Sequence, residues 1–155
     1  MATAGERLCP PPTGYPRLAI CQLMELVFFY GTLMTPFNRT GRLNLDQQLA
    51  YQGRGWIAAA LFDLGIYPAA VPNEDGRVLG EVYEMTQPAP ALRALDELEG
   101  YRPGEPEASL YTRRRTPVYM EDGSVVSAWV YFYNAPLGRA ERIESGDYLE
   151  HLKVR

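Results

Sequence analysis

Histidine and cysteine are scarce in this chain of 155 residues, which contains one histidine and two cysteines. Because His151 lies near the C-terminal end, a Ser-His-Asp or Cys-His catalytic arrangement would have to be built on a terminal tail, and we expect an exposed helix residue there. The spacing of Cys9 and Cys21 fits neither a zinc site nor a redox C-x-x-C pair, so free thiols are expected. The motifs G-x-S-x-G, H-E-x-x-H and the P-loop are also missing, which excludes the chemistries that depend on them.

The chain also lacks a net positive charge and long apolar runs. A net charge of −4 at pH 7 argues against a nucleic-acid partner, which requires a basic face. The run Arg113–Arg115 is the local exception, but a strand places its members on alternate sides, so a solvated edge or structural pairing is expected. The alternative is that Arg113 holds a substrate carboxylate. No apolar stretch approaches the roughly 18 residues that cross a bilayer, and no signal-peptide pattern is present, so we expect a cytoplasmic protein without a membrane partner.

The composition is sufficient for one folded domain, with 46% hydrophobic and 12% aromatic residues. The first residues differ from the rest, because Pro10–Pro12 and Pro16 cannot lie in a helix or a central strand. We predict an extended, proline-rich N-terminal arm over residues 1–25 and a single domain over residues 26–155. Met24 stands just before the first predicted strand, so the arm is either a mobile extension or the product of an upstream start codon.

Apolar segments separated by turn residues predict a sheet-rich domain. The predicted strands are Leu26–Phe29, Val78–Met85, and a hairpin of Leu110–Met120 and Val125–Tyr133 across the Asp-Gly turn Glu121–Ser124. Both faces of the last strand are apolar, as expected for a closed or nearly closed barrel. A short helix is predicted to begin at Ser145 or Asp147. The predicted fold class is α+β, a small mixed β-barrel with a few flanking helices.

The helical periodicity of the apolar residues before Gly100 predicts that one carboxylate points toward the core. With about 100° per residue, Leu92, Leu95 and Glu99 share one stripe of the helix. Gly100 then ends the helix as the residue after its cap, and the prolines at positions 88 and 90 suit its first turn. The neighbouring side chains that we expect to point away from this stripe, where they can be solvated, are Arg93, Asp96 and Glu97.

Glu99 is the candidate general base. Burial and the negative end of the helix dipole both disfavour a carboxylate, so both are expected to raise the pKa of this side chain. A glutamate with a raised pKa suits proton transfer near neutral pH. The alternatives are a side chain that reaches solvent at a fraying helix end and a structural ion pair with Arg113 or Arg115.

The segment Tyr30–Leu33 is the second candidate for a functional role. It follows an apolar strand, and its glycine turns that strand into a loop of exposed backbone N–H groups. Such groups hold an anion or a developing oxyanion. Tyr30 either packs in the core or forms a pocket floor, and Tyr111 either packs or offers its hydroxyl to Glu99 or to a substrate. Tyr67–Pro68 is expected to shape a pocket wall or a turn.

Six sequence blocks, in order, resemble the γ-glutamylcyclotransferase superfamily over residues 26 to about 150. Thr32 makes the chain similar to the AIG2-like branch, which includes γ-glutamylamine cyclotransferase and small bacterial relatives. Six blocks are far more specific than any one of them. They are Tyr30–Leu33, Leu64–Pro68, Gly80–Tyr83, Leu95–Gly100, Tyr111–Arg113 and Ala128–Tyr131.

This resemblance implies the barrel fold and an intramolecular acyl transfer that releases 5-oxoproline and a free amine from a small γ-glutamyl molecule. In the family, the glutamate matching Glu99 is the acid–base residue, and the loop matching Tyr30, Gly31, Thr32 and Leu33 binds the γ-glutamyl group. No cofactor and no metal are implied. Two alternatives stay open: a module of the same fold that binds a small ligand without turnover, and a tailoring enzyme that removes a γ-glutamyl protecting group.

The segment after the loop departs from the family pattern. Met34–Asn38 is more apolar than the basic or glycine-containing stretch that relatives often carry, and we expect it to line the leaving-group side. These residues do not rank glutathione, γ-glutamyl-lysine and γ-glutamyl-polyamines as substrates. The oligomeric state is likewise left open by the sequence.

Overall fold

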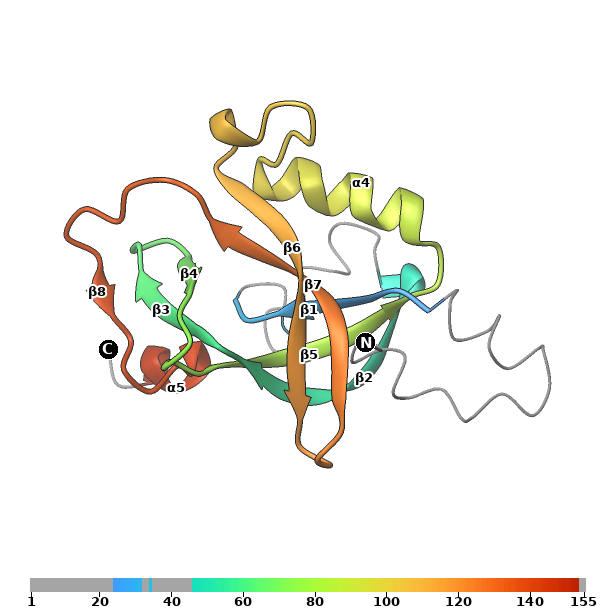
Figure 1. Ribbon diagram of the computed structural model, residues 1–155, viewed down its shortest axis with the longest axis horizontal. Helices are drawn as coiled ribbons and strands as arrows, with labels where there is room; N and C mark the ends of the chain where they lie inside the picture. Colours follow the sequence, from blue (N-terminus) through green and yellow to red (C-terminus); the bar gives the residue numbers. More distant parts are fainter. Residues whose placement is uncertain (1–23, 32–33, 35–45, 154–155) are drawn as a thin grey trace.

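A closed five-stranded β-barrel forms the centre of the protein. The computed structural model describes residues 24–31, 34 and 46–153 (Figure 1). The barrel strands are neighbours in the order β1, β5, β2, β6 and β7, and pairing of β1 with β7 completes the closure. Their bounds are β1 Leu26–Phe29, β2 Leu49–Ile57, β5 Val78–Met85, β6 Tyr111–Met120 and β7 Val125–Tyr133. The predicted class, a small mixed barrel with flanking helices, is confirmed.

The barrel is mixed because β1 runs antiparallel to one neighbour and parallel to the other. Val27 pairs with Tyr83 of β5 in the antiparallel ladder and with Trp129 of β7 in the parallel one. All four residues of β1 are buried, which explains why its sequence is a continuous apolar run rather than an alternating one. The predicted bounds of β1, β5 and β7 are confirmed, and β6 begins at Tyr111 rather than Leu110.

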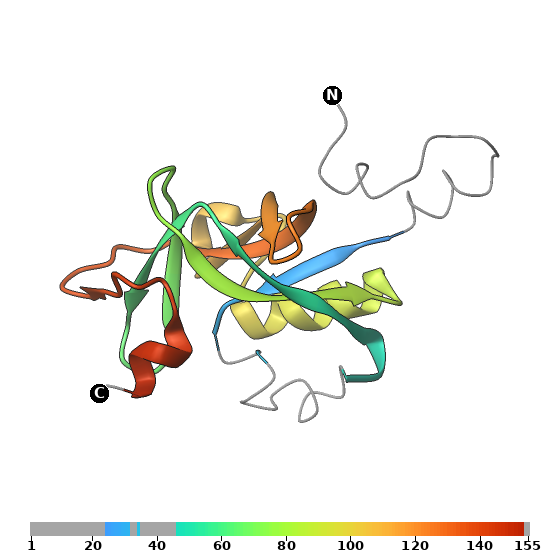
Figure 2. The ribbon, with the colours of Figure 1, turned by 90° about the horizontal axis from the view of Figure 1, so that it is seen from below.

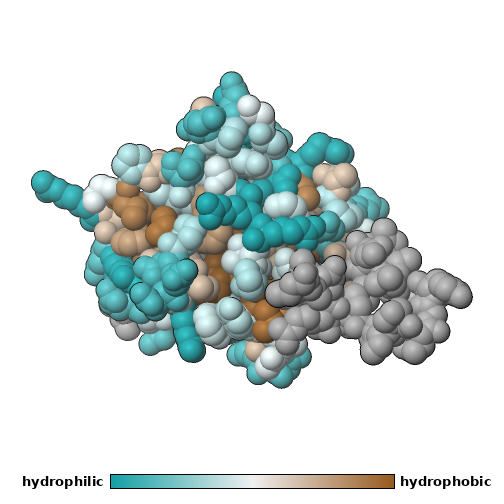
Figure 3. All heavy atoms as spheres, viewed as in Figure 1, coloured by the Kyte–Doolittle hydropathy of each residue, from teal (hydrophilic) through white to brown (hydrophobic). Residues whose placement is uncertain are grey.

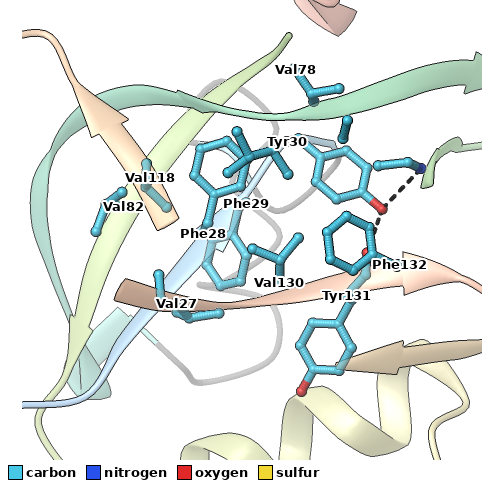
Figure 4. Packing of buried hydrophobic residues seen from close by; sticks show 14 of the residues in the cluster. Val27, Phe28, Phe29, Tyr30, Val78, Val82, Val118, Val130, Tyr131 and Phe132 are labelled. Atoms are coloured by element: carbon cyan, nitrogen blue, oxygen red, sulfur yellow. Dashed lines mark hydrogen bonds between the residues drawn. The ribbon is translucent and has the colours of Figure 1, made fainter. Parts of the chain in front are cut away.

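Side chains from β1, β5, β6 and β7 fill the barrel (Figure 4). Phe28, Val82, Val118 and Val130 are each at most 1% exposed. On the face shown in Figure 3, polar and charged residues cover most of the surface and apolar areas are small and separate. No helix in the described part of the chain is both long and apolar enough to span a membrane.

A second sheet and the C-terminal helix lie together at one end of the molecule, away from α4 (Figures 1 and 2). In this sheet β3 lies between β4 and β8. The bounds are β3 Ala59–Asp63, β4 Pro68–Pro72, β8 Glu141–Arg142 and α5 Tyr148–Lys153. The remaining elements are η2 Asp46–Gln48, α4 Pro88–Glu99 and η3 Pro106–Ala108.

Helix α5 is fixed to the small sheet by a side chain that we expected to be exposed. The helix starts after Asp147, one of its two predicted starts, whose carboxylate accepts the N–H of Glu150 at 3.2 Å. His151 lies only 2.8 Å from the Asp63 carboxylate at the end of β3, and its side chain is 15% exposed. The expectation of an exposed histidine is therefore wrong, because this face of α5 contacts β3.

Several sequence predictions lie outside the described residues. Most of the predicted N-terminal arm, residues 1–25, is among them, and so are Cys9 and Cys21. The proposed loop residues Thr32 and Leu33 are not described either. The predictions made for these positions therefore stay predictions.

Candidate active site

A cavity of about 230 Å³ lies where five elements meet: the end of β1, the start of β4, the end of α4, the start of β6, and β7. Its wall includes Tyr30, Gly31, Pro68, Glu99 and Tyr111. Glu99 is the only acidic or basic side chain among the described residues that line it. This volume lies below the range of about 300–1,000 Å³ that is typical of pockets for drug-sized ligands. It therefore suits a small polar group rather than a drug-sized ligand.

Glu99 reaches this cavity because it is the last residue of α4, on the side of the helix that faces the protein. Leu95, one turn earlier, is fully buried, and Leu98 lines the cavity beside Glu99. Glu99 itself is partly buried. The predicted shared stripe is thus confirmed by the position of its members.

The helix ends sharply after Glu99. Gly100 adopts the left-handed conformation, with φ of +68°, and its N–H is directed at the carbonyls of Asp96 and Glu97. The N–H of Tyr101 donates to the Asp96 carbonyl at 2.8 Å. These bonds form a Schellman motif, which glycine suits because it has no Cβ. The backbone that carries Glu99 is consequently held in one geometry.

Tyr30 belongs both to the core and to the cavity wall. Its hydroxyl donates to the Tyr131 carbonyl at 2.6 Å and accepts the N–H of Ala70 at 3.3 Å (Figure 4). Tyr30 is 7% exposed, so these bonds satisfy buried polar groups from β7 and β4. The two alternatives for Tyr30, packing and pocket floor, therefore coexist.

Gly31 occupies a position where a larger residue would collide with the cavity wall. A Cβ atom there would lie 2.8 Å from Cγ of Pro68 and 3.2 Å from its Cδ. The carbonyl of Gly31 accepts the N–H of Met34 at 3.0 Å. Glycine thus allows the end of β1 to approach the start of β4.

Tyr111 is fixed in the opposite wall. Its hydroxyl donates to the Pro68 carbonyl at 2.9 Å, and its ring lies 6.1 Å from that of Tyr67, centroid to centroid. Tyr67 and Pro68 both line the cavity, as expected for a pocket wall. The hydroxyl of Tyr111 is thus directed at the backbone of β4.

The hydroxyl groups of Tyr30, Tyr111 and Tyr131 stay protonated over the physiological range. Burial raises the pKa of Tyr30, and the nearby charge of Glu99 raises it further. Burial also raises the pKa of Tyr111, with added contributions from Tyr30 and Glu99. The pKa of Tyr131 is raised by burial, by its hydrogen bond to Asp96 and by surrounding charges that include Glu99. Glu99 therefore faces neutral hydroxyl groups.

Asp96 is buried, not solvated as we expected. It is 8% exposed, and its two carboxylate oxygens accept Nε and an Nη of Arg113 at 2.8 and 3.3 Å. The hydroxyl of Tyr131 donates to the same carboxylate at 2.6 Å. The expectation of a solvated Asp96 is wrong because β6 and β7 pack on this side of α4. Periodicity within the helix does not predict that contact.

Arg113 and Arg115, the two arginines considered as ion-pair partners of Glu99, form ion pairs with other carboxylates. Arg113 pairs with Asp96, and Arg115 pairs with Glu25 just before β1. The guanidinium groups of Arg113 and Arg115 lie 4.6 and 4.7 Å from the ring centroid of Trp129. Structural pairing, which we favoured for this run, is confirmed for these two residues.

A cluster able to bind a metal is not found in the part of the chain that the structure describes. There, no group of three or more histidine, cysteine, aspartate and glutamate side chains is placed to hold an ion. Among the described residues that line the cavity, the polar side chains are therefore Glu99 and the tyrosines.

Comparison with known proteins places the chain and its fold in a family. Residues 27–150 match the family described as gamma-glutamyl cyclotransferase, AIG2-like. MJ1514 of Methanocaldococcus jannaschii is 30% identical over 129 residues, which cover 83% of this chain and 98% of that protein. The gamma-glutamylcyclotransferase family protein YtfP of Escherichia coli K12 is 35% identical over 138 residues, covering 82% of this chain and 98% of YtfP. The crystal structure of an AIG2-like protein from Mus musculus superposes with a TM-score of 0.56 at 28% identity, covering 73% of this chain and 80% of that one. The chain therefore belongs to the AIG2-like γ-glutamyl cyclotransferase family.

Proposed function

We propose that this protein is a γ-glutamyl cyclotransferase that converts a small γ-glutamyl amine or amide into 5-oxoproline and a free amine. The observation that carries the proposal is the position of Glu99, whose carboxylate is the only acidic or basic group among the described residues lining the cavity. Family membership supports the same reaction class.

In the proposed reaction the substrate's α-amino nitrogen attacks its own γ-carbonyl carbon. Glu99 takes a proton from that nitrogen as the new C–N bond forms, and it returns a proton to the departing amine as the old C–N bond breaks. Overall a neutral α-amine and an amide become a lactam and a released neutral amine, so the one proton that Glu99 takes is the one that it returns. Because nucleophile and electrophile belong to one molecule, the site has mainly to fold the substrate into a reactive shape.

The end of β1 is proposed to bind the γ-glutamyl group. Backbone N–H groups from Gly31 onward are the proposed donors to the oxyanion of the tetrahedral intermediate, each typically worth a few kcal/mol. The rings of Tyr30 and Tyr111 form the walls that exclude water, which strengthens such electrostatic interactions. Leu110 lines the cavity and is 39% exposed, so the released amine is proposed to leave past this side chain.

The proposal is tested by mass-spectrometric detection of 5-oxoproline after incubation with γ-glutamyl amines, γ-glutamyl dipeptides and glutathione. Wild-type protein is expected to release 5-oxoproline from at least one of them. The variant Glu99→Gln is expected to stay folded, to bind ligand and to turn over at least about 10²-fold more slowly, because it lacks the proton acceptor. Glu97→Gln is the matched control, since Glu97 lies on the same helix but is exposed.

Two results would contradict the proposal. A Glu99→Gln variant with near-normal turnover would remove Glu99 as the general base. Wild-type protein that is folded and binds a γ-glutamyl ligand, yet releases no 5-oxoproline from any substrate, would identify a binding module of the same fold instead.

A further inference from the structure

We propose that Asp96 is a positioning residue that, together with Arg113 and Tyr131, holds the Glu99 end of α4 against the barrel and keeps the surroundings of the Glu99 carboxyl electrically balanced. This inference rests on the function proposed above, in which Glu99 moves the proton. Asp96 does not touch the substrate in this scheme and acts through Glu99.

The side chain of Asp96 joins α4 to two barrel strands at once. Its carboxylate receives two N–H groups of Arg113 from β6, at 2.8 and 3.3 Å, and the hydroxyl of Tyr131 from β7, at 2.6 Å. A bidentate arginine fixes orientation as well as distance. Tyr131 also lines the cavity, and its carbonyl accepts the hydroxyl of Tyr30. The anchor of the helix and the wall of the cavity are thus one hydrogen-bonded assembly.

The backbone of Asp96 fixes the other side of Glu99. Its carbonyl accepts the N–H of Tyr101 at 2.8 Å and contributes to capping by Gly100. Asp96 is therefore anchored on both sides of Glu99. Its side chain bonds to the barrel, and its carbonyl accepts the N–H groups of the helix cap that follows Glu99. Movement of the Asp96 side chain would shift the helix end that carries Glu99.

Asp96 also affects the charge near Glu99. Residues three apart on a helix are neighbours, with Cβ atoms about 5–6 Å apart. Ion pairing with Arg113 makes the Asp96 site neutral overall, so Glu99 faces neither a net negative nor a net positive group there. Both carboxylates act on the hydroxyl of Tyr131. Burial raises the pKa of this hydroxyl most, and the hydrogen bond to Asp96 and the charge of Glu99 raise it further.

Stability alone is a weak reason for this arrangement. A buried ion pair is often no more stabilising than apolar residues of similar size, because both charges lose their hydration. The side chains of Arg113 and Asp96 are 18% and 11% exposed. Arg115, two residues further along β6, and its partner Glu25 are more exposed, at 44% and 25%. The Arg115–Glu25 pair thus offers a matched comparison, because neither of its members belongs to α4.

The test is a ¹³C NMR titration of the Glu99 carboxyl in the full chain and its variants. Asp96→Asn keeps an oxygen that accepts from Tyr131 but leaves Arg113 unpaired, so it is expected to lower the pKa of Glu99 by about one unit. The double variant Asp96→Asn/Arg113→Gln restores neutrality and is expected to return that pKa to the wild-type value. Arg115→Gln is expected to change nothing. An unchanged pKa in a folded Asp96→Asn protein would overturn the inference.

Kinetics supply the second readout. Asp96→Asn and the double variant are expected to lose about 10-fold to 100-fold in kcat with little change in KM, because the base is misplaced while the binding wall remains. If Asp96→Asn does not fold, the double variant decides the matter, and a wild-type kcat there would refute positioning by Asp96. If wild-type protein shows no turnover at all, the proposed function fails, whereas the titration still reports whether Asp96 controls Glu99.

Discussion

Three buried tyrosines give the cavity a wall of fixed hydroxyl groups. Tyr30 and Tyr111 donate to backbone carbonyls, and Tyr131 donates to Asp96. Because each hydroxyl hydrogen already has an acceptor, the three side chains are held in fixed orientations. Reorientation of any one of them would leave a buried carbonyl or carboxylate with one donor fewer, which typically costs about 1–3 kcal/mol.

Gly31 offers a test of how tightly the cavity is closed at single-residue scale. In Gly31→Ala the new methyl group would lie 2.8 Å from Cγ of Pro68, a wall residue that is itself buried. We expect a stability loss of about 1–3 kcal/mol from overpacking, together with weaker binding of 5-oxoproline. Urea unfolding and isothermal titration calorimetry measure the two effects.

Gly104→Ala is the control for that substitution. A Cβ atom at Gly104 would meet nothing within 4 Å, so neither stability nor binding should change. Wild-type affinity for 5-oxoproline in Gly31→Ala would show that the end of β1 does not shape the ligand site.

Helix α4 depends on its terminal glycine to deliver Glu99 to the cavity. Gly100→Ala forces a side chain into the left-handed conformation, and we expect a stability loss of about 1 kcal/mol. Because the strained cap adjoins Glu99, kcat should fall as well. Thermal unfolding and steady-state kinetics on the same preparation measure both quantities.

Gly123→Ala separates the two effects. Gly123 also has a positive φ, +91°, but it lies in the turn between β6 and β7, far from α4 in Figure 1. We expect a similar stability loss with an unchanged kcat. If both variants reduced kcat equally, the loss would reflect general destabilisation rather than the position of Glu99.

The elements that the sequence predicts are those whose pattern is local. Continuous apolar residues mark β1, and the Asp-Gly turn marks the hairpin of β6 and β7. The strands β2, β3 and β4 were not predicted, because glycine, alanine and proline interrupt their hydrophobic pattern and pairing with β5 or with each other fixes them. Glu99 was placed on the inner face of α4, whereas burial of Asp96 depends on β6 and β7 and could not be derived from periodicity.

At the scale of the whole molecule, burial of the three tyrosine hydroxyls ties stability to alkaline pH. The pKa of each is raised above its usual value of about 10 by burial. The folded state therefore keeps protons that the unfolded chain loses, and this contribution to stability is complete below pH 10 and declines above it.

We expect the free energy of unfolding to fall above pH 10 by up to about 4 kcal/mol per pH unit, or about 1.4 for each of the three groups. Urea unfolding between pH 8 and pH 11 measures this slope. Tyr111→Phe should reduce the slope by about a third. A slope that is flat up to pH 11 would mean that these hydroxyls ionise as readily in the folded protein as in the unfolded chain.

The closure of the barrel has a consequence for the order in which the protein is made. Tyr30 and the Tyr131 carbonyl that it binds are 101 residues apart in sequence, and β1 also pairs with β7. Contacts between such distant segments form slowly, because closing a long loop costs conformational entropy before the contacts stabilise the chain. A nascent chain that has not yet released β7 from the ribosome has only part of the cavity wall. The cavity wall is therefore completed only after β7 has been synthesised and has paired with β1.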